Sequence, residues 1–157
     1  MTDPITPLRV LQVVPGQVGV TTDPETHYTA ITGAGVVVCL RDTITKFGGL
    51  AYFLFPDGEN HNLTETRFGH QAIAVLIQRI VALGGETIWL EAKLFGGAKT
   101  HDGRRDIGRR NADYAIRALR RQKIPVLTQS LGGNQVRRVN FSPHRGECEE
   151  LLLHHGP

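Results

Sequence analysis

Blocks of hydrophobic and polar residues alternate along the chain, and their spacing predicts where strands and helices lie. Two continuous apolar runs, at residues 36–41 and 50–55, are typical of buried strands in a central sheet. Residues 19–27 are polar and rich in turn-forming residues, so this segment is expected to be a loop. Shorter strands are expected over residues 8–14, 87–92, 125–130, 135–141 and 146–153.

Two further segments have the period of an amphipathic helix. Apolar residues recur every three to four positions over residues 67–83, and the glycine pair at 84–85 is a typical helix C-cap. A second helix is expected over residues 107–122, with its arginines largely outside the apolar stripe. The order of strands, helix, strand, helix and strands favours an α/β (α+β) fold, in which a layered sandwich of mixed β-sheet is flanked by helices.

The length of 157 residues is that of a single domain, and it is sufficient to bury a core without disulfides or metal. We expect this domain to span residues 9–153, with a flexible N-terminal tail at 1–8 and a C-terminal tail at 154–157. The sequence shows neither an apolar stretch of membrane-spanning length nor a secretory signal pattern. Cys39 and Cys148 are its only cysteines, so a protein of the reducing cytoplasm, without membrane insertion, is expected.

Basic residues are unevenly distributed in this chain, whose formal net charge is +3. Seven arginines and a lysine lie between Arg104 and Lys123, against two aspartates. The preferred interpretation is the solvated face of a helix. The alternative is a surface for an acidic partner or for nucleic acid. Nucleic acid is not expected as a partner.

Glycine-rich and histidine-containing segments give no cofactor or metal motif. The stretch TGAGVVV lacks the third glycine of a dinucleotide-binding loop and leads into an expected strand, where that loop needs a helix. The seven histidines show no metal-binding spacing and no grouping with the cysteines. Cys39 lies in an apolar run, where a free cysteine usually packs as a small hydrophobic residue. No cofactor and no metal are therefore expected.

Six segments in a fixed order carry a resemblance that covers nearly the whole chain. They are GAGVVVCLRD, GGLAYFLFP, RFGHQAIAVLI, LEAKLFGGA, IGRRNADYAIRAL and IPVLTQSLGGNQVRRVNF. In this order and spacing the chain resembles the CheD family of bacterial chemoreceptor glutamine deamidases. The resemblance implies a CheD-like sandwich and the hydrolysis of receptor glutamine side chains to glutamate, with release of ammonia. It also implies a catalytic cysteine that attacks the amide, a histidine that moves the proton and a threonine that orients the histidine.

The active-site pattern of this family is only partly kept. The family segment T-L-G-x-G-S-C-V-A-V-C corresponds to residues 29–39 of this chain. The threonine is kept as Thr29, the nucleophilic cysteine is replaced by Gly35, and the second, non-catalytic cysteine is kept as Cys39. The family segment G-G-M-A-H places Tyr52 at the position of the base. Glycine has no nucleophile, and tyrosine is a poor base near neutral pH. We therefore expect a pseudoenzyme that binds its partners without deamidating them.

The resemblance implies two classes of partner, the cytoplasmic domains of chemoreceptors and CheC-type phosphatases of the response regulator CheY. A basic helix face suits acidic partners, because complementary charge speeds association. The candidate partner-binding residues are Arg109, Arg110, Arg117 and Phe95.

Two alternatives remain open for the altered site. In the first, the chain is an active protein-glutamine deamidase that uses Cys39 as nucleophile with His27 as base. Positions 35 and 39 of an extended strand point to the same side but lie about 13 Å apart, so Cys39 replaces a nucleophile at 35 only after a register shift. In the second, the reshaped cleft binds a new small ligand, unless Tyr52 fills it.

Overall fold

The computed structural model describes residues 8–57, 65–99 and 106–153. The tails expected at 1–8 and 154–157 lie outside these ranges, except for Leu8, which is exposed. The described chain contains two β-sheets and two α-helices. This arrangement confirms the α+β sandwich that the sequence predicts.

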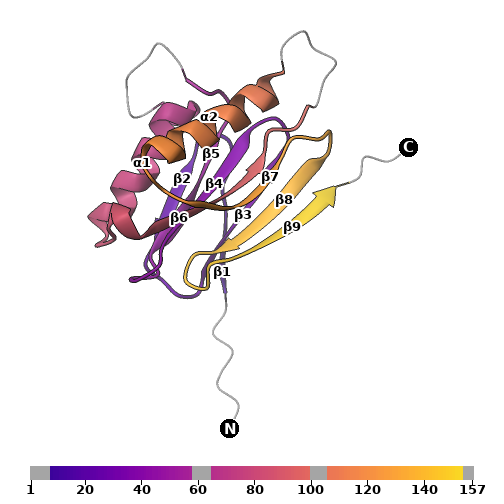
Figure 1. Cartoon of the computed structure of the whole chain (residues 1–157). Helices are drawn as coiled ribbons and strands as arrows, with labels where there is room; N and C mark the ends of the chain where they lie inside the picture. Colours follow the sequence, from indigo (N-terminus) through magenta and orange to yellow (C-terminus); the bar gives the residue numbers. More distant parts are fainter. Residues whose placement is uncertain (1–7, 58–64, 100–105, 154–157) are drawn as a thin grey trace.

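Three layers stack in the molecule, and a five-stranded sheet forms the middle one (Figure 1). This central sheet has the strand order β2-β5-β4-β6-β7, and both helices pack on one of its faces. The outer sheet, with the order β1-β3-β8-β9, covers the other face. The strands are β1 Arg9–Gln12, β2 Val18–Thr21, β3 Thr26–Thr32, β4 Val36–Asp42, β5 Gly48–Phe53, β6 Leu90–Gly96, β7 Val126–Leu131, β8 Val136–Ser142 and β9 Glu147–Leu153. The helices are α1 Gly69–Ala82 and α2 Ile107–Arg121, with a 3-10 helix at Thr87–Trp89.

The continuous apolar run of β4 is explained by its place in the middle of this stack. Val36, Val38 and Leu40 pack toward the helices. Val37 and Cys39 pack toward the outer sheet. Side chains alternate along a strand, so a strand that is covered on both faces needs apolar residues at every position.

Strand β5 follows the same rule beside β4, and it carries position 52 into the space between the sheets. Ala51 and Phe53 face the helices, whereas Leu50 and Tyr52 face the outer sheet. The antiparallel register pairs Tyr52 with Val37 of β4. The side chain at position 52 therefore points into the core between the two sheets, and not toward the helices.

The two helices begin and end close to the predicted positions. α1 buries Leu76 and Ile80 on the central sheet, and Gly84, with a φ of 118°, follows its end. At the start of α2 the side chain of Asp106 accepts a hydrogen bond from the backbone N of Arg109 at 3.0 Å, which caps the helix. Within the described ranges no helix is long and apolar enough to cross a membrane.

Two sequence-based predictions about strands are wrong. Residues 18–32 contain β2 and β3, although residues 19–27 have the composition of a loop. β2 is an edge strand of half-buried residues, and β3 buries only every second residue, so neither strand has a continuous apolar run. The segment at 87–92 begins as a 3-10 turn and enters β6 only at Leu90.

Candidate functional site

Two of the positions that the family resemblance selects, Gly35 and Tyr52, meet at one end of the central sheet. Gly35 lies immediately before β4, Tyr52 is the next-to-last residue of β5, and Gly96 ends β6. In the strand register Val36 pairs with Phe53 on one side and with Gly96 on the other. Segments that are far apart in the sequence are therefore direct neighbours at this end of the sheet.

The carbonyl oxygen of Gly35 is held by two donors. The hydroxyl of Thr32 donates to it at 2.6 Å, and the backbone N of Gly97 donates to it at 3.0 Å. Gly96 has a φ of 117°, and a Cβ added to it would lie 2.2 Å from the same oxygen. The close approach of β6 to the residue before β4 therefore requires a glycine at position 96.

Asn111 of α2 connects the helix layer to this end of the sheet. Its Nδ2 donates to the carbonyl oxygen of Ala34 at 3.0 Å and to that of Leu54 at 2.8 Å. Asn111 is completely buried. A single amide group thus joins the loop before β4 to the chain that leaves β5.

The ring of Tyr52 lies directly against Gly35. An ideal Cβ on Gly35 would be 2.6 Å from Cε1 of Tyr52 and 2.7 Å from the carbonyl oxygen of Phe53, and real Cβ atoms essentially never come this close to other atoms. Tyr52 itself is only 5% exposed. The ring and the β5 backbone therefore occupy the space that a side chain at position 35 would need.

The hydroxyl of Tyr52 is also held in place. It donates a hydrogen bond to the carbonyl oxygen of Ile31 in β3 at 2.8 Å, so the side chain bridges the central and outer sheets. Burial raises the pKa of Tyr52 above its ordinary value, and the nearby Thr32 hydroxyl offsets only part of this effect. At neutral pH Tyr52 keeps its proton, and that proton is already donated to the backbone. The side chain is suited to packing and not to proton transfer.

Thr29, the retained residue of the family pattern, lies on the other face of its strand. Burial alternates along β3, with Tyr28 in the core between the sheets and Thr29 half-buried on the opposite side. Thr32 faces inward, and its hydroxyl is the one close to Tyr52. The structure thus brings Thr32, and not Thr29, to the altered site.

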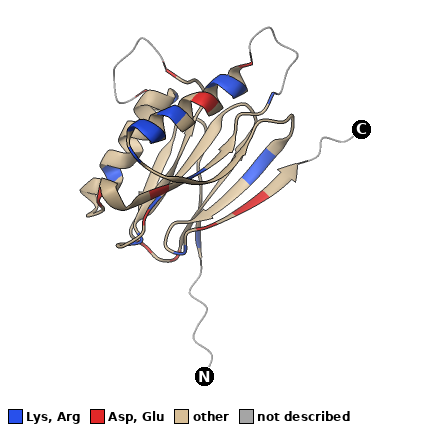
Figure 2. Ribbon diagram, in the orientation of Figure 1, with Lys and Arg blue, Asp and Glu red and all other residues tan. Residues whose placement is uncertain are grey.

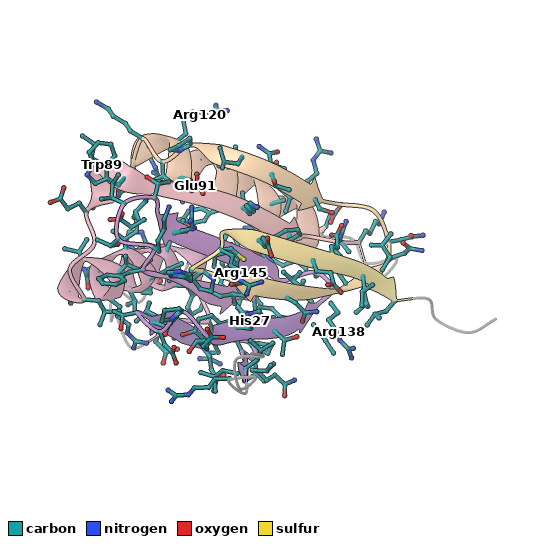
Figure 3. All side chains as sticks on the ribbon, turned by 90° about the horizontal axis from the view of Figure 1, so that it is seen from below. His27, Trp89, Glu91, Arg120, Arg138 and Arg145 are labelled. Atoms are coloured by element: carbon teal, nitrogen blue, oxygen red, sulfur yellow. The ribbon has the colours of Figure 1, made fainter. Side chains whose placement is uncertain are left out.

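The alternative pair, Cys39 and His27, is not brought together. Cys39 is 1% exposed in the core between the sheets, where Cys148 of β9 packs against the same group of side chains. Burial raises the pKa of the Cys39 thiol well above its ordinary value, the neighbouring Cys148 adds to this effect, and Lys93 opposes it. His27 belongs to the half-buried set of β3, on the outer face of the outer sheet (Figure 3). A thiolate at Cys39 is disfavoured, and the strand β3 separates the two side chains.

The four candidate partner-binding residues divide into two kinds. Arg109, Arg110 and Arg117 are exposed on α2, where Figure 2 shows several basic residues along the helix. Phe95 is 3% exposed and lies in β6 opposite Val37, in the core between the sheets. The arginines are therefore available to a partner, whereas Phe95 is not.

Sequence reasoning did not select Thr32, although it shapes the loop before β4 through a buried hydrogen bond. Asn111 lies in the family segment IGRRN, where a structural role is expected, either as a helix cap or as a hydrogen bond to a loop, and the structure shows the bond to the loop before β4. A hydroxyl residue three positions before a glycine is a signal for a local side chain–backbone bond, which identifies Thr32 in retrospect. The two hydrogen-bond partners of Asn111 are 77 and 57 residues away in the sequence. No local pattern reveals contacts of that range.

The larger cavities of the described surface do not lie beside Gly35. One cavity of about 660 Å³ opens between β1 and β2, and one of about 570 Å³ lies along the arginines of α2. In the part of the chain that the structure describes, no group of three or more His, Cys, Asp or Glu side chains is arranged to hold a metal ion. The position beside Gly35 is filled by Tyr52.

Comparisons with known proteins point to one family. A family model described as "CheD chemotactic sensory transduction" matches residues 54–150. A protein of Caulobacter vibrioides is 38% identical over 153 residues, which cover 96% of this chain and 81% of the relative. A protein of Agrobacterium fabrum is 35% identical over 144 residues, covering 91% and 80%. A protein of Cereibacter sphaeroides is 34% identical over 146 residues, covering 93% and 73%.

Each of these relatives carries the name "Probable chemoreceptor glutamine deamidase CheD". The family model begins to match after Gly35 and Tyr52, whereas the similarity to the relatives extends over nearly the whole chain. Together they confirm the resemblance that the six sequence segments indicate. This chain belongs to the CheD family.

Proposed function

We propose that this protein acts in chemotactic signalling by binding the cytoplasmic domains of chemoreceptors without deamidating them. The observation that carries the proposal is the contact between Tyr52 and Gly35, in which a phenol ring fills the space beside a residue without a side chain. Deamidation by a cysteine needs a thiolate to attack the side-chain amide and an acid to protonate the amide nitrogen, so that it leaves as ammonia. Gly35 provides no thiolate, and the Tyr52 proton is committed to the Ile31 carbonyl.

The buried cysteine is a poor substitute for the missing nucleophile. A receptor glutamine would have to enter the core between the two sheets to reach the sulfur of Cys39, which is 1% exposed. The raised pKa of this thiol leaves little thiolate at neutral pH. These two properties favour a binding role over an active site that has moved to Cys39 and His27.

The surface that we propose for the partner is the basic face of α2. Its exposed basic residues are Arg109, Arg110, Arg117, Arg120 and Arg121. The exposed acidic residue of the same helix is Asp113, so the face has a clear excess of positive charge. Such a face attracts acidic partners and raises the rate at which they associate. Chemoreceptor cytoplasmic domains are the partner we favour, and a CheC-type phosphatase is the second.

A deamidation assay tests the catalytic half of this proposal. The purified protein is incubated with chemoreceptor cytoplasmic fragments, and mass spectrometry detects conversion of glutamine to glutamate. We expect no conversion by the natural protein. The double variant Gly35→Cys/Tyr52→His restores the two chemical groups, and Gly35→Ala/Tyr52→His is its control without a thiol. Conversion by the natural protein would overturn the proposal, and loss of that conversion in Cys39→Ala would then identify the alternative nucleophile.

A binding assay tests the other half. Affinity for the receptor fragments is measured by calorimetry at two salt concentrations. We expect the Arg109→Glu/Arg117→Glu variant to bind about tenfold or more weakly and to lose most of the salt dependence, because screening acts on these charges. Arg138→Glu/Arg145→Glu reverses two exposed charges outside α2 and is the matched control (Figure 3). Equal losses in both variants would exclude α2 as the surface that binds chemoreceptors. If a CheC-type phosphatase bound the natural protein and the α2 variant with equal affinity, α2 would also be excluded as the surface that binds the phosphatase.

A further inference from the structure

A cavity of about 400 Å³ opens on the outer face of the outer sheet, on the opposite side of that sheet from the Tyr52 ring. It lies where β3, β8 and β9 run side by side, and His27 marks its position in Figure 3. The residues that line it are His27, Asn140, Ser142, Glu147, Cys148 and Glu149. Apart from the cysteine, all of them carry polar or ionisable side chains.

The strand register explains why these polar side chains share one face. Asn140 pairs with Glu149, and Ser142 pairs with Glu147, across β8 and β9. Residues that are paired directly across an antiparallel ladder point to the same side of the sheet. The ladder between β3 and β8 pairs Thr29 with Asn140, and His27 lies on the same face of β3 as Thr29. Three adjacent strands thus present one polar surface.

Ser142 indicates that the cavity is built for a ligand. The residue is only 4% exposed, and its Oγ has no hydrogen-bond partner in the described structure. A buried hydroxyl without a partner is unfavourable, because the group has lost water and gained nothing in return. The same side chain lines the cavity, so a polar group that enters it would supply the missing partner.

The two carboxylates add a requirement for positive charge. Glu147 and Glu149 are exposed, and within the described residues neither side chain forms an ion pair or a hydrogen bond. By contrast, the inward-facing Glu150 pairs with Arg137 at 3.1 Å. Two like charges on one face of a strand, about 7 Å apart, repel each other weakly in water, and a cation bound between them would turn this repulsion into attraction. The free charges at this cavity therefore select a positively charged group.

We propose that this cavity binds a guanidinium group. A metal ion does not suit it, because the described side chains nowhere form a group of three His, Cys, Asp or Glu ligands. A guanidinium has several N–H donors in a planar fork, which match two carboxylates, a hydroxyl and an amide oxygen from different directions. The volume of about 400 Å³ accommodates this group and a short alkyl chain. This site is independent of the Tyr52–Gly35 contact, so it stands whether or not the protein deamidates receptors.

Titration of the full chain with L-arginine, followed by the amide signals in NMR spectra, tests the proposal. We expect saturable shifts of residues 27 and 140–149. L-citrulline has nearly the same shape but no charge on its side chain, and we expect it to bind at least about tenfold more weakly, since charge-assisted hydrogen bonds are lost. N-acetyl-L-arginine methylamide separates two sources of the group. Equal binding of this capped form assigns the site to the arginine side chain of a protein, and weaker binding assigns it to a free small molecule.

Variants locate the binding in the cavity. The Glu147→Gln/Glu149→Gln variant should bind arginine about tenfold more weakly, and Ser142→Ala about threefold more weakly. Ser142→Ala removes a group without a partner, so the fold should persist. Glu86→Gln neutralises an exposed glutamate outside the cavity and should leave binding unchanged. Equal binding of arginine and citrulline, undiminished binding by the double variant or the absence of saturable shifts would overturn the proposal.

Discussion

Cε1 of Tyr52 occupies the position into which the first side-chain atom of any larger residue at Gly35 would project, because an ideal Cβ there would lie 2.6 Å from it. The phenol ring cannot simply rotate away, since its hydroxyl is bound to Ile31 of β3 at 2.8 Å. The two positions therefore form one packing unit, and a change at either one has to be judged together with the other.

A double-mutant cycle should measure this coupling. Gly35→Cys should lower the free energy of unfolding by about 1–3 kcal/mol, because the added atoms overpack a filled space. Tyr52→His should lower it by about 2 kcal/mol, since the ring contact and one hydrogen bond are lost. The double variant should be more stable than the sum of the two losses by about 1 kcal/mol. Urea denaturation of the four proteins gives these values.

The carbonyl oxygen of Phe53 limits how much stability the double variant can regain. It lies 2.7 Å from the same ideal Cβ and remains in place when Tyr52 is replaced. The double variant should therefore stay less stable than the natural protein. Strictly additive losses would show that Tyr52 and Gly35 do not share one space, contrary to the geometry.

Asn111 should contribute more to the free energy of unfolding than any exposed residue of α2. Replacing it with alanine leaves the carbonyl oxygens of Ala34 and Leu54 buried without their donor. We expect Asn111→Ala to lower the free energy of unfolding by about 2–3 kcal/mol. Asp113→Ala changes an exposed residue of the same helix and should shift it by less than about 0.5 kcal/mol. Similar effects of the two substitutions in urea denaturation would contradict the proposed bridge.

The tyrosines should titrate unusually late in the folded protein. The chain has three tyrosines. Burial raises the pKa of Tyr28 to about 12, and it also raises the pKa values of Tyr52 and Tyr114. The absorbance of tyrosinate should therefore rise well above pH 10 in the folded protein but near pH 10 in denaturant. Titration near pH 10 in both states would contradict the buried environment of the rings.

This shift has a consequence for stability at high pH. A raised folded-state pKa means that the unfolded chain loses its tyrosine protons first, so stability is complete below about pH 10 and falls as the pH rises further. For Tyr28 the loss extends to its folded-state pKa of about 12. Tyr28→Phe should therefore show a shallower decline in the free energy of unfolding between these two pH values.

The two cysteines should differ in reactivity. Cys39 is buried with a raised pKa, and Cys148 is half-buried at the edge of the outer sheet. A thiol reagent at pH 8 should modify one cysteine of the folded protein rapidly and the second only after unfolding. Cys148→Ser should abolish the rapid phase. If Cys39 reacted in the folded state of that variant, the core would have to open more readily than its packing indicates.

Elements with a strong period were predictable from the sequence, because burial alone sets their pattern. The helices around Leu76 and Leu119 and the doubly covered strand β4 belong to this group. The strands β2 and β3 did not follow such a rule, since one lies at an edge and the other faces solvent on one side. Their alternation was too short and too polar to distinguish from a loop.

The site was predictable only where the family pattern supplied it. That pattern led to Gly35 and Tyr52 but could not reveal that the two residues touch, because a contact between strands depends on register. It also led to Thr29, whereas the fold turns Thr32 toward the altered site. The direction of a side chain on a strand changes with each residue, so a resemblance in sequence does not by itself fix which hydroxyl faces inward.

The mutual exclusion at positions 35 and 52 also constrains the history of this chain. If its ancestor had the cysteine and histidine of the family pattern, tyrosine could not enter first without colliding with the side chain at position 35. The order that avoids a clash begins with cysteine to glycine at position 35, which opens a small void. Histidine to tyrosine at position 52 then fills this void. The reverse path has a fixed order as well: tyrosine must change to histidine first, which opens the same void, because a cysteine that entered first would meet the ring. Packing thus sets the order of the two substitutions in both directions, with glycine at position 35 and histidine at position 52 as the intermediate.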